Sequence, residues 1–219
     1  MSFPPTSTTD RADDATSEPT RGRPRDPSRD TAILDAAVEL LVADGYDLVT
    51  MEHIASHAGV GKATVYRRWG SKAALVMDAV ARIKPSQPTV DTGSLDGDLD
   101  QLIDAACHRS TEQASRVMCG IAAALGRDPE LLAAFRTRFT QPRIQRIAEV
   151  LERAQQRGEI EPHIDVQRAA ELVPSLLLQH TLFTGERAPR DYVEWAIGSV
   201  LLPALGRPHR PTVTTRSHP

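Results

Sequence analysis

Apolar residues recur at helical spacing along most of the chain, and no segment alternates apolar and polar residues over the length of a strand. The first apolar stripe follows Asp26-Pro27, a cap and first-turn pair, and it ends at Gly45, as expected of a glycine just past a helix end. Three shorter helices are predicted over residues 51–58, 61–69 and 71–84. The pattern therefore indicates an all-α fold.

The helical pattern is interrupted once, over residues 85–97, where Pro, Gly, Ser, Thr and Asp prevail. We take this stretch as the boundary between an N-terminal helical domain (26–84) and a larger helical domain (97–206). Residues 1–25 and 207–219 carry no apolar pattern, so we expect a disordered leader and a disordered tail.

The second domain contains two segments that are apolar on more than one side. They are Ala169–Phe183, interrupted by Pro174, and Tyr192–Leu205. Pro142 must begin a helix or kink one. The excess apolar surface must be covered, either by a second subunit or by a larger internal core.

The composition of the 219 residues narrows the class of protein. Aromatic residues make up 4%, which argues against a β-rich fold, and no apolar run approaches the length of a membrane span. The N-terminus has no secretion signal, and Cys107 and Cys119 form no CxxC pair, so a reducing cytoplasm is expected. We find no metal-ligand set, cofactor motif or catalytic constellation, and we predict no enzymatic activity.

Charge is distributed unevenly although the net charge is only −3. No Asp or Glu occurs between Glu52 and Asp78, and this acid-free window is a local anion-facing surface. Its cations are Lys62, Arg67, Arg68 and Lys72.

The sequence Ala58-Gly59-Val60-Gly61 joins the second and third helices in a helix-turn-helix arrangement, since a turn glycine permits positive φ. The outer face of the third helix offers donors, a methyl group and an amphipathic ring, which suit phosphates, base edges and a thymine methyl. These residues are Lys62, Ala63, Thr64, Tyr66, Arg67 and Arg68. Spacing alone equally allows an ordinary corner of two helices with a solvated basic face.

This region resembles the N-terminal DNA-binding domain of the TetR family of bacterial transcriptional regulators. The matching run is Thr50-Met51-x-x-Ile54-Ala55-x-x-Ala58-Gly59-Val60-Gly61-Lys62-Ala63-Thr64-Val65-Tyr66-Arg67-Arg68-Trp69-Gly70-Ser71-Lys72-x-x-Leu75. The resemblance implies a helix-turn-helix over residues 50–69. It also implies phosphate contacts at Thr64, Tyr66 and Lys72, and contacts to bases at Lys62, Ala63 and Arg67.

Two positions depart from the family's usual residues. Arg68 stands where many members have His and keeps a phosphate donor, whereas Trp69 stands where many have Phe and is expected in the core. Thr50 and Gly61 complete the predicted DNA-binding set.

An extended basic arm precedes the first helix. Its arginines, Arg21, Arg23 and Arg25, are separated by Gly22 and Pro24, and the arm resembles the core of an AT-hook. Such a thin strand fits a narrow minor groove, while a solvated basic linker is an equal alternative.

The second domain is similar to a TetR-family effector domain. The shared segments are Phe135-Arg136-x-x-Phe139-x-x-Pro142-Arg143, Arg153-Ala154-x-x-Arg157-Gly158-Glu159-Ile160 and Thr184-Gly185-Glu186. The resemblance implies a ligand-responsive domain whose last two helices pair with those of a second subunit. The expected dimer contacts are Leu176, Leu177, His180, Phe183, Trp195, Val200 and Leu201. Other apolar faces could line an effector cavity or simply form core, and they contain Leu102, Ala106, Ile121, Leu125, Phe135 and Phe139.

The sequence thus predicts a cytoplasmic, homodimeric, sequence-specific regulator that binds a double-stranded DNA operator and does not engage a membrane. Repression released by an unknown small-molecule effector is the family's commoner output, and activation stays open. The rival hypothesis is a helical small-molecule-binding or enzymatic protein whose basic face has no function.

Overall fold

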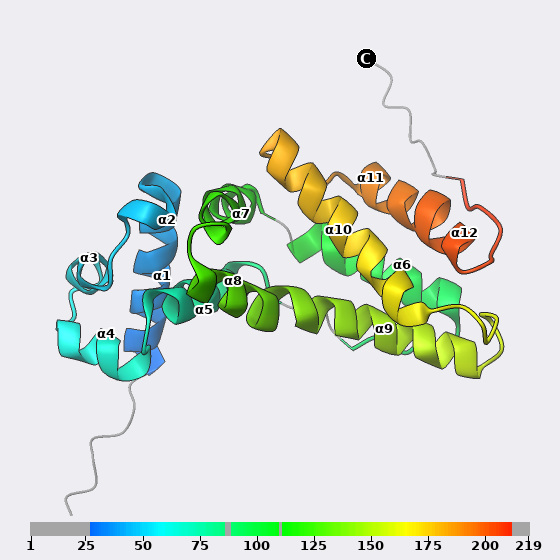
Figure 1. The fold of residues 1–219 in the computed structure, drawn as a ribbon, viewed down its shortest axis with the longest axis horizontal. Coiled ribbons are helices and arrows are strands. Elements are labelled where there is room, and N and C mark those ends of the chain that lie inside the picture. Colours follow the sequence, from blue (N-terminus) through cyan, green and yellow to red (C-terminus); the bar gives the residue numbers. More distant parts are fainter. Residues whose placement is uncertain (1–26, 86–88, 110, 212–219) are drawn as a thin grey trace, which may run out of the picture.

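The computed structural model describes residues 27–85, 89–109 and 111–211, and all regular secondary structure in these ranges is helical (Figure 1). The elements are α1 (Pro27–Ala43), α2 (Gly45–Leu48), α3 (Met51–His57), α4 (Lys62–Arg68), α5 (Lys72–Ile83), α6 (Leu95–Arg109), α7 (Glu112–Leu125), α8 (Pro129–Phe135), η1 (Arg136–Thr140), α9 (Gln141–Gln156), α10 (Val166–Thr184), α11 (Arg190–Trp195), η2 (Ala196–Leu201) and α12 (Leu202–Ala204). None of these helices is both long and apolar enough to cross a membrane. The predicted leader, residues 1–25, lies outside the described residues, as does the predicted cap Asp26.

A first hydrophobic core joins α1–α5 to α7 and α8. Ile33, Ile54 and Leu75 are fully buried in it, and so are Ile121 and Leu131 from the later helices. The core of the N-terminal helices is therefore completed by residues beyond the linker. A second core is formed by α6, α9, α10, α11, η2 and α12.

One continuous helical rod, made of α8, η1 and α9, runs from the first core to the second (Figure 1). Its middle segment, η1, is π-helical, with the Gln141 amide donating to the Arg136 carbonyl five residues back. Pro142 follows in the first turn of α9 and has no backbone N–H to donate. The π-helical turn before it shifts the hydrogen-bond pattern from four to five residues at this point. The π-helical segment η2 likewise precedes Pro203. Pro174, by contrast, lies inside α10 without interrupting it, which corrects the sequence prediction.

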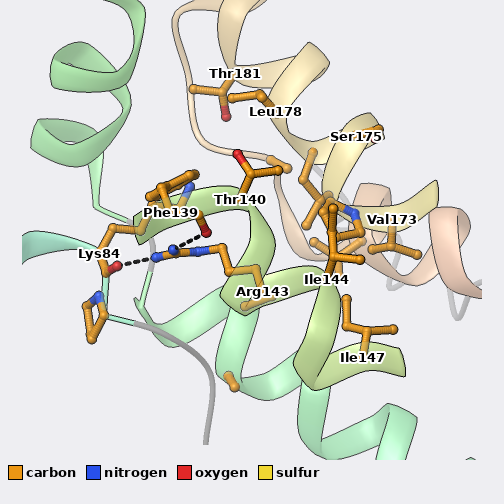
Figure 2. Close-up of a pocket in the computed structure, with 17 residues that line it drawn as sticks. Lys84, Phe139, Thr140, Arg143, Ile144, Ile147, Val173, Ser175, Leu178 and Thr181 are labelled. Carbon is orange, nitrogen blue, oxygen red and sulfur yellow. Dashed lines mark hydrogen bonds between the residues drawn. The ribbon is translucent and has the colours of Figure 1, made fainter. Parts of the chain in front are cut away.

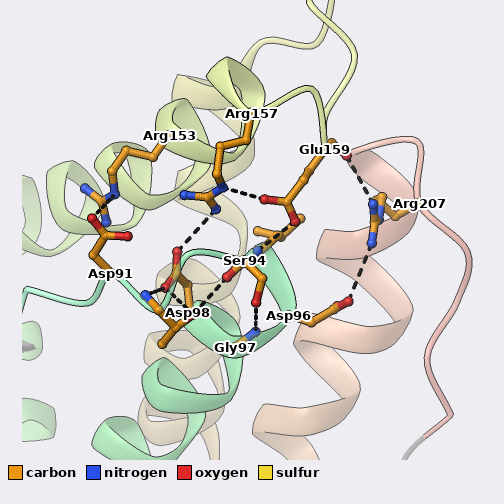
Figure 3. A network of polar contacts seen from close by, with 11 residues as sticks. Asp91, Ser94, Asp96, Gly97, Asp98, Arg153, Arg157, Glu159 and Arg207 are labelled. Atoms are coloured by element: carbon orange, nitrogen blue, oxygen red, sulfur yellow. Dashed lines mark hydrogen bonds and ion pairs between the residues drawn. The ribbon is translucent and has the colours of Figure 1, made fainter.

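A polar network fixes the linker to the end of α9 (Figure 3). Buried Asp98 accepts hydrogen bonds from the amide and hydroxyl of Thr92 at 2.6 and 2.8 Å. Arg157 pairs with Asp98 at 3.5 Å and with Glu159 at 2.6 Å, while Glu159 accepts from the Leu95 amide at 2.8 Å. α6 begins at Leu95, inside the predicted linker, and the network holds the non-helical residues just before it against α9.

The first five residues after the predicted second domain, 207–211, are part of the fold, which corrects the expectation that the whole tail is disordered. The Arg210 amide donates to the Gly198 carbonyl at 3.2 Å, and its guanidinium pairs with Asp100 at 2.8 Å. A Cβ at Gly198 would stand 2.3 Å from the Arg210 carbonyl oxygen, so only glycine allows this approach. Residues 212–219 lie outside the described residues.

Candidate DNA-binding surface and effector cavity

Local sequence signals fix the angle between α3 and α4. Thr50 caps α3, its Oγ1 accepting from the His53 amide at 3.1 Å. Gly59 adopts φ +65°, and the Val60 amide then donates to the Ala55 carbonyl at 2.9 Å. Gly61 precedes α4 with an ordinary φ of −70°, so the left-handed turn residue is Gly59.

The outer face of α4 is open to solvent, while Val65 anchors its inner face in the first core. Lys62, Ala63 and Arg67 are exposed, and Tyr66 is 49% exposed. The side chains of Lys62 and Arg67 have no hydrogen-bond or ion-pair partner among the residues that the structure describes. Two unpaired cations on an exposed helix suit binding to an anionic polymer.

Tyr66 is tied to the preceding helix. Its hydroxyl donates to Oε1 of Glu52 at 2.9 Å. The pKa of Glu52 is lowered by a hydrogen bond from its own backbone amide and by the Tyr66 hydroxyl, so a carboxylate stands beside the expected DNA surface. Glu52 is the acidic residue that directly precedes the acid-free window of the sequence. Its contact with Tyr66, fourteen residues later, joins two helices and could not be predicted from the sequence.

Two predicted phosphate donors, Arg68 and Lys72, also contact other parts of the protein, and their contact with DNA stays a prediction. Arg68 forms an ion pair with Asp30 of α1, and its side chain is only 16% exposed. Lys72 donates to the Tyr46 carbonyl at 3.0 Å and lies 3.9 Å from the centre of the Tyr46 ring. Thr64 is half-buried, whereas Thr50 and Gly61 are exposed. The arm arginines Arg21, Arg23 and Arg25 lie outside the described residues.

Trp69 lies in the first core at 7% exposure, which confirms its predicted core role. Its Nε1 donates to Asp78 of α5 at 2.9 Å. The other oxygen of Asp78 accepts from Arg138 of η1 at 2.7 Å. The end of the recognition helix α4 is thus linked through one carboxylate to the rod.

Residues 33–79 match the family described as bacterial regulatory proteins of the tetR family, and residues 89–200 match the tetracyclin repressor-like C-terminal domain. The chain belongs to the TetR family. It is a DNA-binding transcriptional regulator and not an enzyme, which confirms the prediction and sets the rival hypothesis aside.

Similar proteins support this assignment. The HTH-type transcriptional regulator YdeS of Bacillus subtilis is 35% identical over 174 residues, covering 79% of this chain and 88% of YdeS. The DNA-binding transcriptional repressor TetR of Mycobacteroides abscessus is 29% identical over 180 residues, covering 81% and 94% of the two chains. The crystal structure of the TetR family transcription regulator SCO0332 superposes with a TM-score of 0.62 at 28% identity, covering 80% of this chain and 97% of the other.

The regulator has a cavity of about 140 Å³, partly open to solvent, between the end of α5, the segment η1 and the helices α6, α9, α10 and α11 (Figure 2). Of the predicted lining residues, Ala106 and Phe139 line it, and Leu102 lines a smaller cavity beside it. Ile121, Leu125 and Phe135 belong instead to the first core, which corrects that part of the prediction. An apolar helix face looks the same in sequence whether it meets another helix or a cavity.

Sequence reasoning missed the two cations at the cavity, Lys84 and Arg143. Arg143 was part of a family motif, but nothing in its spacing showed that it faces inward. Figure 2 shows both side chains beside Phe139 at one end, with Ile144, Ile147 and Val173 toward the other.

The expected dimer contacts divide into exposed and internal residues. Phe183 is 82% exposed and Trp195 is 40% exposed. Leu176, Leu177, His180 and Val200 are half-buried, and Leu177 also lines the cavity. Leu201 is 1% exposed within the second core, so its assignment to an interface is wrong.

Proposed function

We propose that this regulator is a cytoplasmic homodimeric repressor whose two α4 helices enter successive major grooves of a roughly palindromic operator. The observation that carries the proposal is the exposed face of α4, where Lys62 and Arg67 have no hydrogen-bond or ion-pair partner among the described residues. One such helix reads few base pairs, and paired helices about 34–36 Å apart would reach two half-sites.

The exposed aromatic side chains support a dimer. Phe183 and Trp195 lie on α10 and α11, and a monomer would leave them in water together with Leu182, which is 37% exposed. Pairing of these helices from two subunits would remove this surface from water, and apolar burial stabilises by about 25 cal/mol per Å².

The cavity supports release by a small molecule. It lies beside the rod that carries Arg138, and Arg138 contacts the Asp78 carboxylate that also holds Trp69. A ligand that binds one arrangement of the rod more tightly shifts the population toward it, and operator affinity falls by the difference.

The experiment combines light scattering with a gel shift on the DNA just upstream of the regulator's own gene. We expect a dimer and a retarded complex of one dimer with one operator. Phe183→Glu should give a folded monomer with weakened operator binding, whereas Leu48→Glu alters a residue that is 71% exposed on α2 and should leave the dimer intact. A monomeric wild type that binds the operator with full affinity would contradict the proposal. A reporter assay tests whether the regulator represses or activates transcription. Deletion of its gene should raise transcription from the operator, and lower transcription would indicate an activator.

A further inference from the structure

The cavity is chemically asymmetric. Lys84 and Arg143 lie at one end, and none of the described residues that line it is an Asp or Glu. The remaining lining is apolar except for three hydroxyl side chains, Thr140, Ser175 and Thr181. Two largely buried cations with no acidic residue facing them carry an electrostatic cost, and a bound anion would offset it.

Arg143 is positioned rigidly but only partly used. Its Nη1 donates to the Phe139 carbonyl at 2.8 Å, its Nη2 donates to the Lys84 carbonyl, and its guanidinium lies 3.7 Å from the centre of the Phe139 ring. A guanidinium has five N–H donors, and within residues 27–85, 89–109 and 111–211 no further partner takes the rest. The remaining donors suit a planar acceptor such as a carboxylate.

Lys84 supplies the second charge. Its Nζ lies 6.0 Å from the centre of the Phe139 ring, and no acceptor or carboxylate among the described residues contacts it. Burial and the nearby charge of Arg143 lower the pKa of Lys84 to about 8, so the ammonium is largely protonated at neutral pH yet poorly stabilised. An anion placed between the two groups would relieve both the burial and the repulsion.

We propose that the cavity binds a small hydrophobic monocarboxylate, whose carboxylate lies between Lys84 and Arg143 and whose hydrocarbon part packs against Ile144, Ile147 and Val173. The regulatory consequence rests on the proposed function, because it takes this cavity to be the effector site. The apolar remainder disfavours inorganic phosphate, and the two cations disfavour amines. The volume of about 140 Å³ suits a hydrocarbon part near the size of one ring.

The position of the cations explains how such a ligand would act on DNA binding. The Lys84 carbonyl that Arg143 holds is the cap at the end of α5, and α5 follows the recognition helix directly. A carboxylate on the remaining donors of Arg143 would draw the guanidinium toward the cavity and lengthen its hydrogen bond to this carbonyl. The end of α5 would then be less firmly held to α9.

The experiment compares monocarboxylates from benzoate and phenylacetate to octanoate with their primary amides, by calorimetry and by the shift in melting temperature. We expect at least one acid to bind about tenfold or more tightly than its amide, because charge-assisted hydrogen bonds are about twice as strong as neutral ones. Lys84→Met keeps the volume and should abolish most of this preference, and Lys84→Arg should restore part of it. Arg116→Gln removes an exposed cation of α7 outside the cavity and should leave the preference unchanged.

The outcomes separate the ligand class from the effector role. The assignment of a carboxylate is overturned by any of three results. These are equal affinity for every acid and its amide, an affinity for phosphate equal to that for the acids, or an unaltered preference for acid over amide in folded Lys84→Met. Carboxylates that bind through Lys84 without releasing the operator in a gel shift would uphold the ligand class and refute its role as effector.

Discussion

The hydroxyl of Tyr46 donates a hydrogen bond of 2.6 Å to Oδ2 of Asp128, which joins α2 to the N-cap of α8. Tyr46 is 3% exposed, and Lys72 lies over its ring. Burial and the Asp128 carboxylate raise the pKa of Tyr46, and the bond from Tyr46 lowers the pKa of Asp128. One buried phenol thus links the DNA-binding helices to the start of the rod.

Tyr46→Phe should lower the free energy of unfolding by about 1–2 kcal/mol, since it removes a hydrogen bond to a charged group. The pKa of Asp128 is depressed in the folded state, so this contribution is present above the unfolded carboxyl pKa of about 3.9 and is lost as pH falls through the folded value. Urea unfolding of the wild type and the variant at pH 7 and at about pH 2 measures the difference, which should be smaller at the lower pH. Tyr192→Phe is the control, because no hydrogen bond of the Tyr192 hydroxyl occurs in the described part of the chain, and an equal loss in both variants would contradict the account.

Gly198→Ala should destabilise the fold by about 1–3 kcal/mol, because the added methyl would collide with the Arg210 carbonyl and displace residues 207–211. Gly120→Ala is the matched change in α7, where the nearest neighbour of the new Cβ lies at 4.0 Å. There we expect stabilisation by about 0.5–1 kcal/mol, because alanine favours a helix over glycine. Thermal unfolding of both variants tests the packed tail, and a neutral Gly198→Ala would show that the tail is dispensable.

Binding of a carboxylate to the cavity should weaken as pH rises above about 8. Lys84 loses its proton in this range, whereas Arg143, the other charged group facing the site, keeps its own, with a pKa that burial lowers to about 10. The affinity should be flat from pH 6.5 to 7.5 and fall toward about tenfold per unit above pH 8. Calorimetry at pH 7 and pH 9 measures this, and Lys84→Met should show no comparable fall; identical profiles would refute the role of Lys84.

The free energy of unfolding should depend on pH in the opposite sense to the ligand affinity, because of Lys84. The folded pKa of about 8 lies below the unfolded value, so the unfolded state binds more protons between about pH 8 and 10.5. Stability without ligand should therefore gain from rising pH in this window relative to Lys84→Met. Parallel pH curves for the two proteins would contradict a buried, unpaired ammonium.

Arg138→Gln should reduce the effect of ligand on DNA binding while leaving ligand affinity nearly unchanged. Arg138 is outside the cavity lining, but it holds Asp78, the residue that also accepts from Trp69. The ratio of operator affinities with and without ligand should fall by about 2–10-fold, a typical range for a modulating contact. Anisotropy titrations with and without ligand give this ratio, and Arg82→Gln, which breaks an exposed pair with Asp35, is the control.

Much of the DNA-binding domain is predictable because local chemistry determines it. Thr50 and Ser71 cap helices, Gly59 permits the turn, and apolar spacing places Ile54 and Val65 inside. The short helix α2 was not predicted, since four residues carry no periodic signal.

What the sequence could not supply are contacts between distant residues. The pairing of Arg68 with Asp30 and the placement of Lys72 on Tyr46 depend on how distant segments of the chain meet, and the charge pattern carries no signal for either contact. The cavity was only half predicted for the same reason, since Ile121 packs in the first core and does not line the cavity. The sequence shows where the prolines are, but it did not predict that α10 continues through Pro174.

The most direct test of the central claim compares Arg67→Ala with Arg68→Ala on the operator upstream of the regulator's gene. Fluorescence anisotropy should show that Arg67→Ala weakens binding by about 1–3 kcal/mol with an unchanged melting temperature, because the side chain is exposed and unpaired in the described structure. Arg68→Ala should lower the melting temperature, because it breaks the pair with Asp30. Full operator affinity in folded Arg67→Ala, and in the double variant with Lys62→Ala, would contradict the assignment of α4 as the helix that reads DNA.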